Sequence, residues 1–101
     1  MASRLNLHTK LEELLGTENV YFQPPESIKM QYPAIVYSLS NIQNTFADNT
    51  VYSQSYFYEV TVIDYNPDSE IAITLSKLPK VRFNRHFKSD KLNHYVFTIY
   101  Y

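Results

Sequence analysis

The feature that most limits how this chain can fold is a long strand-forming run followed at once by a helix signal, in residues 51–77. Almost every residue up to 63 is β-branched, aromatic or hydroxylated, which suits a pleated, half-buried surface. Because side chains alternate along a strand, two sets face opposite ways. One set is Tyr56, Tyr58, Val60 and Val62, and the other is Ser55, Phe57, Glu59, Thr61 and Ile63. Such a long strand exceeds what a lone hairpin needs, so we expect it in the middle of a sheet.

The same run predicts a helix after the strand. Asn66 is the expected N-cap, because its side chain can accept a backbone N–H, and Pro67 suits the first helical position. Asp68 and Glu70 would then lie in the first turn, where the helix dipole favours negative charge. The apolar residues that follow have helical spacing: Ile71, Leu75 and Leu78. We expect this helix to pack on one face of the sheet.

A first helix is predicted over residues 2–15, with Ser3 as a candidate N-cap. Its apolar stripe consists of Leu7, Leu11, Leu14 and Leu15. Gly16 suits the left-handed residue that commonly ends a helix. A short strand is predicted at 19–23, where two prolines stop it, and a loop at 24–32.

The middle of the chain predicts a long hairpin. Residues 33–39 form a strand too apolar to leave a solvated face, and its Asn-rich continuation turns at 48–50. The simplest interpretation pairs 33–46 with 51–64, with a tip at 44–49. Such an arm would extend beyond the compact body.

The end of the chain predicts a second hairpin. Alternation in 81–87 places Phe83, and with it Phe87, on the inside, and 88–93 is predicted to be a turn. The last strand, 94–101, has high β propensity and no charge. We expect it to be paired or at an interface, because an exposed strand of this kind aggregates.

The element order is therefore α-β-β-β-α-β-β. This order predicts an α+β fold: a central mixed or antiparallel sheet, helices packed on a face, and a projecting long hairpin. The 101 residues fit a single domain, 1–101. The single glycine makes tight type I′ turns an unexpected feature.

Composition excludes several classes of function. The absence of cysteine rules out disulfides, thiolate metal sites and cysteine nucleophiles. A formal charge of −1 gives no global attraction to nucleic acid or membrane. No apolar run approaches the ~18 residues of a membrane span, and the start lacks a signal-peptide pattern, so we expect a soluble, intracellular chain. Ten tyrosines and six phenylalanines suit sheet surfaces and protein interfaces.

The sequence contains no catalytic motif, so we expect no enzyme activity and no cofactor. One alternative is a zinc site, if His86 and His94 face each other across the last hairpin beside Asp90. Paired polar residues on a solvated sheet face explain these residues equally well. His8 is expected to be a surface residue.

Residues 80–91 are locally basic, and three interpretations remain open. Five cations outweigh Asp90 there: Lys80, Arg82, Arg85, Lys88 and Lys91. Alternating basic and aromatic residues are typical of single-stranded nucleic-acid-binding surfaces, here with Phe83 and Phe87. The same pattern fits a solvated strand face with both phenylalanines inside. In a third interpretation the cations meet acidic residues of a neighbouring subunit.

Four runs carry a resemblance to a known family. They are RLNLHTKLEELLGTENVYFQPPESIKMQYPAIVYSL, ADNTVY, YEVTVIDYNPDSEIA and KSDKLNHYVFTIYY. Together they cover most of the chain. They resemble the small tail-terminator, or tail-completion, proteins of tailed bacteriophages and prophages of low-GC Gram-positive bacteria, often labelled minor capsid proteins.

The resemblance implies a virion structural protein of the phage tail and neck, assembled in the host bacterial cytoplasm. Such proteins form a ring, typically hexameric, on the last ring of tail-tube subunits, stop tube polymerisation and join the tail to the neck or connector. A sheath would be a further partner in a contractile tail. Genomic DNA would pass through the lumen without specific binding, so the basic residues 80–91 are expected to face protein. A head-completion or neck adaptor is the nearest alternative.

Within such a ring, subunit and tube contacts are expected on the arm, on the basic strand and on the last strand. The candidate contact residues are Asn44, Phe46, Asp48, Tyr52, Tyr56, Arg82, Arg85, Tyr95 and Tyr101. The uncharged strand edge at 95–101 would be covered by neighbouring subunits.

Overall fold

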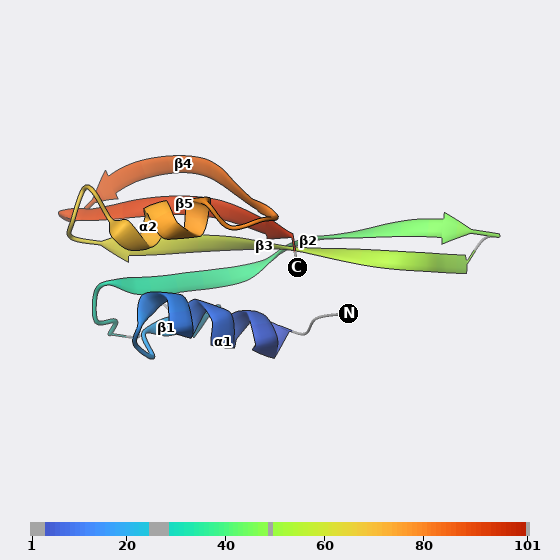
Figure 1. Ribbon diagram of the computed structural model, residues 1–101, viewed down its shortest axis with the longest axis horizontal. Coiled ribbons are helices and arrows are strands. Elements are labelled where there is room, and N and C mark those ends of the chain that lie inside the picture. Colours follow the sequence, from blue (N-terminus) through green and yellow to red (C-terminus); the bar gives the residue numbers. More distant parts are fainter. Residues whose placement is uncertain (1–3, 25–28, 49, 101) are drawn as a thin grey trace.

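A computed structural model describes residues 4–24, 29–48 and 50–100, with only the backbone for 51–53. Its elements follow the predicted order and confirm the α+β fold. The strands are β1 (Val20–Phe22), β2 (Ala34–Ala47), β3 (Thr50–Asp64), β4 (Val81–Ser89) and β5 (Leu92–Tyr100). They form one mixed sheet in the order β1-β2-β3-β5-β4, in which β1 runs parallel to β2 and the other neighbours are antiparallel (Figure 1). β3 thus lies in the middle, as its length and composition predicted.

Both helices pack on one face of this sheet. α1 (Arg4–Leu15) and α2 (Glu70–Ser76) share a core with one set of alternating strand residues. The helices contribute Leu7, Leu11, Leu15, Ala72 and Leu75, and the strands contribute Val20, Ile35, Tyr37, Tyr58, Val60, Val62, Phe97 and Ile99. Burial of each large aliphatic side chain contributes roughly 1.5–3 kcal/mol. The predicted set of Tyr58, Val60 and Val62 therefore faces the helices.

The opposite face of the sheet, called the open face below, carries the other alternating set. Ala34 pairs with Ile63, and Thr61 pairs with Val96. Ala34, Ile63 and Val96 are buried there. Neither of the two helices in the described residues lies on this face, since both belong to the core described above.

α1 ends as the sequence predicts. Gly16 has a φ of 81°, and its N–H donates to the carbonyl of Glu12 at 2.9 Å. A left-handed residue at this position satisfies a carbonyl that the helix leaves unpaired. The proposed cap Ser3 lies outside the described residues.

The predicted cap of α2 is wrong. Ser69, not Asn66, is the N-cap: its buried side chain accepts from the N–H of Ala72 at 3.3 Å. Asn66 instead accepts from the N–H of Asp68 at 2.9 Å and so closes a turn before the helix. Pro67 and Asp68 therefore lie in that turn, not in the helix. Asn66 lies three residues before Ser69, and its side chain bonds a backbone N–H in a turn instead of in a helix. The helix therefore starts later than the sequence predicted.

The last turn is tighter than predicted. β4 and β5 run to Ser89 and from Leu92, so only Asp90 and Lys91 connect them. Both residues have positive φ, 52° and 66°, which is the backbone of a type I′ turn. This geometry forms here without glycine, because aspartate tolerates the left-handed region.

β2 and β3 continue far past the rest of the sheet (Figure 1). The last pair that β5 makes with β3 is Tyr100 with Phe57, and beyond it β2 and β3 pair only with each other. The molecule is accordingly elongated, with a longest dimension of 52 Å against 28 and 23 Å. We call residues 42–56 the arm.

Candidate assembly interface

The arm is a two-stranded ribbon with no core of its own. Six residue pairs, from Ile42 with Tyr56 to Ala47 with Thr50, make it about 20 Å long. A two-stranded hairpin is marginally stable at best in water without further packing. The structure confirms the predicted projecting hairpin, and because only its base packs on the body, the outer arm is a surface suited to a partner.

A β-bulge at Ser40 determines which way the arm's apolar residues face. Leu39 pairs with Tyr58, and the next pair is Asn41 with Phe57, so Ser40 is the extra residue. This insertion changes the parity of β2: odd residues face the helices before it and even residues after it. Ile42 and Phe46 therefore continue the apolar face that Tyr37 and Leu39 begin.

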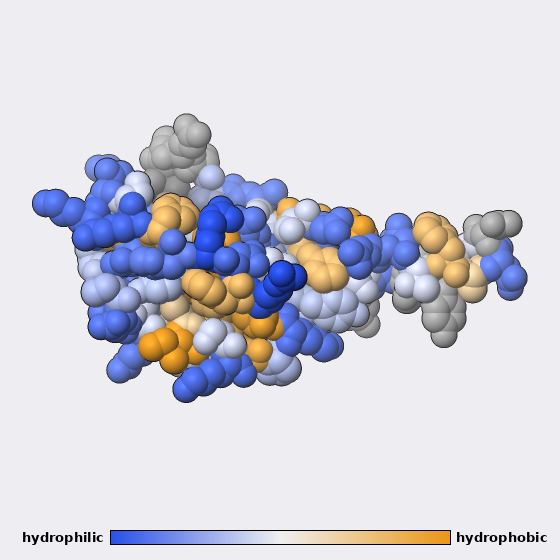
Figure 2. All heavy atoms as spheres, turned by 90° about the horizontal axis from the view of Figure 1, so that it is seen from above, coloured by the Kyte–Doolittle hydropathy of each residue, from blue (hydrophilic) through white to orange (hydrophobic). Residues whose placement is uncertain are grey.

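The two faces of the arm differ in polarity. The face that continues the helix-covered side contains Ile42, Asn44, Phe46, Gln54 and Tyr56. Phe46 is 63% exposed and Ile42 is 45% exposed, although both residues pair with β3. The other face contains Gln43, Thr45 and Ser55, and Asp48 is the only charged residue between 38 and 58. Figure 2 shows the arm standing clear of the body, with apolar side chains among hydrophilic ones.

Three of the candidate contact residues lie together at the outer part of the arm. Asn44, Phe46 and Asp48 are exposed, and Asp48 begins the tip turn with a φ of 52°. Tyr56 lies at the arm's base, half-buried against the core, and its hydroxyl donates to Gln54 Oε1 at 3.0 Å. The side chain of Tyr52 and the whole of Tyr101 lie outside the described residues.

Tyr95 has a role within the chain. Its half-buried ring packs against the core, and its hydroxyl donates to the carbonyls of Asn66 and Pro67, which fixes the loop before α2.

The expectation that neighbouring subunits cover the strand edge at 95–100 is wrong, because β3 and β4 pair with the two sides of β5. The sequence could not assign β5 to the interior of the sheet, since strand order depends on tertiary contacts.

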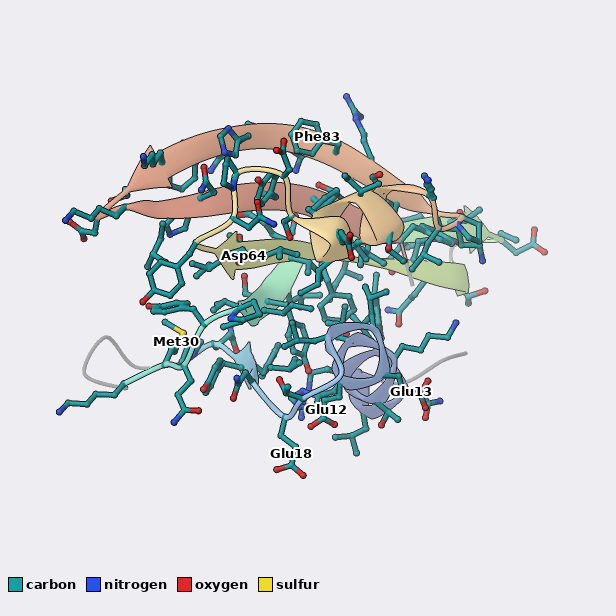
Figure 3. The ribbon with its side chains drawn as sticks, turned by 60° about the vertical axis from the view of Figure 1, so that its left-hand side comes forward. Glu12, Glu13, Glu18, Met30, Asp64 and Phe83 are labelled. Atoms are coloured by element: carbon teal, nitrogen blue, oxygen red, sulfur yellow. The ribbon has the colours of Figure 1, made fainter. Side chains whose placement is uncertain are left out.

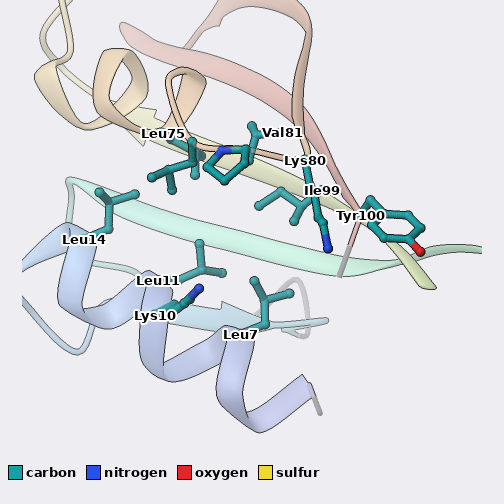
Figure 4. Close-up of a pocket in the computed structure, with 11 residues that line it drawn as sticks. Leu7, Lys10, Leu11, Leu14, Leu75, Lys80, Val81, Ile99 and Tyr100 are labelled. Atoms are coloured by element: carbon teal, nitrogen blue, oxygen red, sulfur yellow. The ribbon is translucent and has the colours of Figure 1, made fainter. Parts of the chain in front are cut away.

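A groove that the sequence did not indicate lies between the two helices and the end of β5 (Figure 4). It has a volume of about 360 Å³, at the lower end of the ~300–1,000 Å³ typical of ligand pockets. Its lining is mainly apolar: Leu7, Leu11, Leu14, Leu75, Leu78, Pro79, Val81, Ile99 and Tyr100, with Lys10 and Lys80. Residues from α1 and from the segment after α2 meet only in the folded chain, so periodicity within one helix could not reveal the groove.

β4 forms the basic edge of the sheet, and its exposed residues do not alternate as predicted. The register shift between Phe83 and Arg85 makes Asn84 a bulged residue. Phe83 therefore lies opposite Phe97 on the helix side, whereas Phe87 stacks on His94 on the open face. Both phenylalanines are exposed, at 50% and 41%, so the interpretation that placed them inside is wrong. Arg82 and Arg85, opposite Thr98 and Val96, share the open face with Phe87.

Acidic residues gather on the other side of the molecule (Figure 3). Glu12, Glu13 and Glu18 surround a shallow depression at the end of α1, a helix that contacts β1 and β2. The sheet order places β1 and β4 at opposite edges, so this acidic end lies away from the basic strand. The molecule thus carries opposite charge at its two edges although its net charge is only −1.

The proposed zinc ligands are not assembled. His86 lies opposite Tyr95, and His94 lies opposite Phe87, so the two imidazoles are on opposite faces of the sheet. His86 Nε2 instead makes a 3.0 Å hydrogen bond with Oδ1 of the buried Asn93. Within the described residues, no group of three or more His, Cys, Asp or Glu side chains could hold a metal ion.

His8 is part of a polar cluster under α1, not a simple surface residue. Its Nδ1 shares a 2.6 Å hydrogen bond with the hydroxyl of Tyr37, which also accepts from Arg4 at 3.4 Å. The guanidinium of Arg4 lies 4.2 Å from the ring centre of Phe22, a cation–π contact. Burial raises the pKa of the Tyr37 hydroxyl above its ordinary value, and Arg4 only partly opposes this effect. The cluster anchors α1 to β2.

Comparison with known proteins gives no independent assignment: no protein-family model and no curated protein matches the chain. In the part of the chain that the structure describes, no helix is long and apolar enough to cross a membrane.

Proposed function

We propose that this chain is a virion structural protein of a phage tail. It forms a hexameric ring that caps the tail tube, stops its polymerisation and joins the tail to the neck or connector. The observation that carries this proposal is the arm: six residue pairs that project from the body, packed against it only at the base, with the apolar side chains of Ile42 and Phe46 exposed. An arm of this kind is marginal alone and becomes ordered against a partner.

Two further observations support an assembly role. The four runs that resemble tail-terminator proteins include the arm tip and the strand–turn–helix segment, and the α+β fold is the one that the resemblance implies. The opposite charges of the acidic α1 end and the basic β4 edge suit a head-to-tail contact between copies. Head-to-tail contacts between different surfaces close into rings when the rotation permits. The ring size and the tube and neck partners rest on the resemblance.

The experiment is to measure the mass of the purified chain by size-exclusion chromatography with light scattering, alone and with purified tail-tube protein. We expect a ring, or binding of a ring to tube ends that halts tube growth. A chain that stays monomeric at high concentration and never binds tube ends would overturn the proposal. Pull-downs against tube and connector proteins separate a tail terminator from the neck-adaptor alternative, which would bind the connector alone.

A second candidate function is binding of single-stranded nucleic acid. The observation in its favour is that Arg82, Arg85 and Phe87 share the open face, with the Phe87 ring stacked on His94 at 4.6 Å. Cations beside aromatic rings are the surface on which bases stack. This candidate predicts binding of short oligonucleotides that weakens steeply with salt. The absence of any mobility shift at low salt would remove it.

A further inference from the structure

We propose that the arm of one copy seats Phe46 in the groove between α1 and α2 of another copy. This inference rests on the proposed function and deepens it, because it names the contact that links neighbouring subunits. The occupant of the groove is thus the tip of an identical chain.

The groove has the character of a docking site for an apolar side chain. Leu11, Leu14 and Leu78 come from α1 and from the segment after α2, and Ile99 comes from β5. Leu78 is 43% exposed, so it presents apolar surface at the mouth. An apolar side chain that enters here removes apolar area from water on both partners.

The arm supplies the matching surface. Phe46 is the most exposed aromatic or aliphatic side chain on the described part of the arm, at 63%. Phe46 and Ile42 both follow the bulge at Ser40 and are four residues apart on β2, so they lie on the same face and the arm presents one apolar edge. Rigid aromatic side chains that fill pockets dominate the energetics of protein interfaces.

Charge is complementary between the two surfaces. Lys10 and Lys80 line the groove (Figure 4), and Nζ of Lys80 lies 5.1 Å from the ring centre of Tyr100. The arm contains no cation, and its single charged residue, Asp48, lies two positions from Phe46. Seating Phe46 therefore brings a carboxylate to a lysine-rimmed pocket. Complementary charge at the rim of an interface favours encounter and register.

The contact must form between copies. The groove is lined by Ile99 and Tyr100, which pair with Tyr58 and Phe57 directly below the arm. Phe46 lies farther out, after about four more residue pairs of the ribbon. The tip cannot return to the groove of its own chain without breaking this ladder, and Figure 1 shows the arm pointing away from both helices.

Cysteine cross-linking tests the contact directly, because the natural chain has no cysteine. An Asn44→Cys chain, which keeps Phe46 and places the thiol on the same face of the arm, is mixed with a Leu78→Cys chain and exposed to dissolved oxygen with a copper catalyst. We expect a mixed disulfide dimer that forms at least about tenfold faster than with two matched controls. Thr45→Cys places the thiol on the opposite face of the arm, and Ile73→Cys places it on α2 outside the groove.

A second measurement reads the energy of the contact. Phe46→Ser should weaken self-association at least about tenfold, whereas Thr45→Ser should leave it unchanged. Phe46 is exposed, so the thermal unfolding of both variants should match the natural chain. If the natural chain self-associates but the Asn44→Cys and Leu78→Cys chains cross-link no faster than the controls, the inference is wrong and the ring proposal stands. If the natural chain neither self-associates nor binds tube ends, the proposed function itself fails.

Discussion

At the scale of single residues, the hydroxyl of Tyr37 shows how a polar group is accommodated in the core. Tyr37 is 1% exposed, yet its hydroxyl is satisfied by His8 and Arg4. Burying a hydroxyl without such partners would cost free energy, so these two contacts make a tyrosine acceptable in the core. A phenylalanine at this position would fill the same space and leave Arg4 and His8 without that partner.

Tyr37→Phe should lower the free energy of unfolding by about 1–2 kcal/mol near pH 7. Burial raises the pKa of Tyr37, so the folded chain holds its proton more tightly than the unfolded chain does. The stability linked to this group is therefore fully present below about pH 10 and lost as the pH rises through the raised pKa. Denaturant unfolding of both proteins from pH 8 to 11 checks this. The difference between them should shrink above pH 10, and a constant difference would contradict the assignment.

At the scale of elements, single polar residues determine where α2 starts and how the last hairpin turns. Asn66 and Ser69 both have side chains that cap helices, and they lie three residues apart. Ser69 is buried and its Oγ reaches the N–H of Ala72, whereas Asn66 is exposed and closes a turn. Packing against the sheet selects the start that buries Ala72 and Leu75.

Ser69→Ala should therefore destabilise the protein by about 1–2 kcal/mol, because it leaves the N–H of Ala72 unpaired. Asn66→Ala is the matched control and should cost less, since its turn is exposed to water. Chemical denaturation of the three proteins measures both values. If Asn66→Ala lowered the free energy of unfolding more than Ser69→Ala, Asn66 would be the N-cap, as the sequence predicted.

The turn between β4 and β5 allows a stabilising change. Lys91 has a φ of 66°, which costs a residue with a side chain more than it costs glycine. Lys91→Gly should raise the free energy of unfolding by about 0.5–1 kcal/mol, as the type I′ turn favours glycine there. Lys88→Gly, in the regular part of β4, should lower it instead. Thermal and denaturant unfolding distinguish these two signs.

At the scale of the whole molecule, the body and the arm have separate tasks. The body holds the core, and the arm beyond Tyr56 adds exposed surface. The acidic α1 end and the basic β4 edge lie at opposite sides of the sheet, which gives each copy two different faces for its neighbours. Tyr56, at the arm's base, packs against the core, so a substitution there would change stability as well as assembly. Phe46 is exposed, so its substitution tests assembly without changing stability.

If the charged edges meet, single charge reversals should impair assembly. Arg85→Glu or Glu13→Lys alone should weaken self-association, because each places like charges across the contact. A 1:1 mixture of the two variants should assemble again, since every contact in an alternating ring then joins opposite charges. Light scattering at low and high salt measures this, and the natural contact should weaken with salt. Failure of the mixture to recover would show that these edges do not face each other.

The sequence by itself determined the order of the elements, the central long strand, the glycine end of α1 and the projecting hairpin. These follow from local causes: side-chain alternation, β-branched composition, helical spacing and one left-handed residue. The tertiary structure alone decided three things: the burial of β5 between its neighbours, the cap at Ser69, and the groove between α1 and α2. It also decided the three register shifts, at Ser40, Tyr52 and Asn84, each of which changes the face of the residues that follow on its strand. The reason is physical: a one-residue insertion reverses strand parity, and only pairing with a partner strand reveals where that insertion lies.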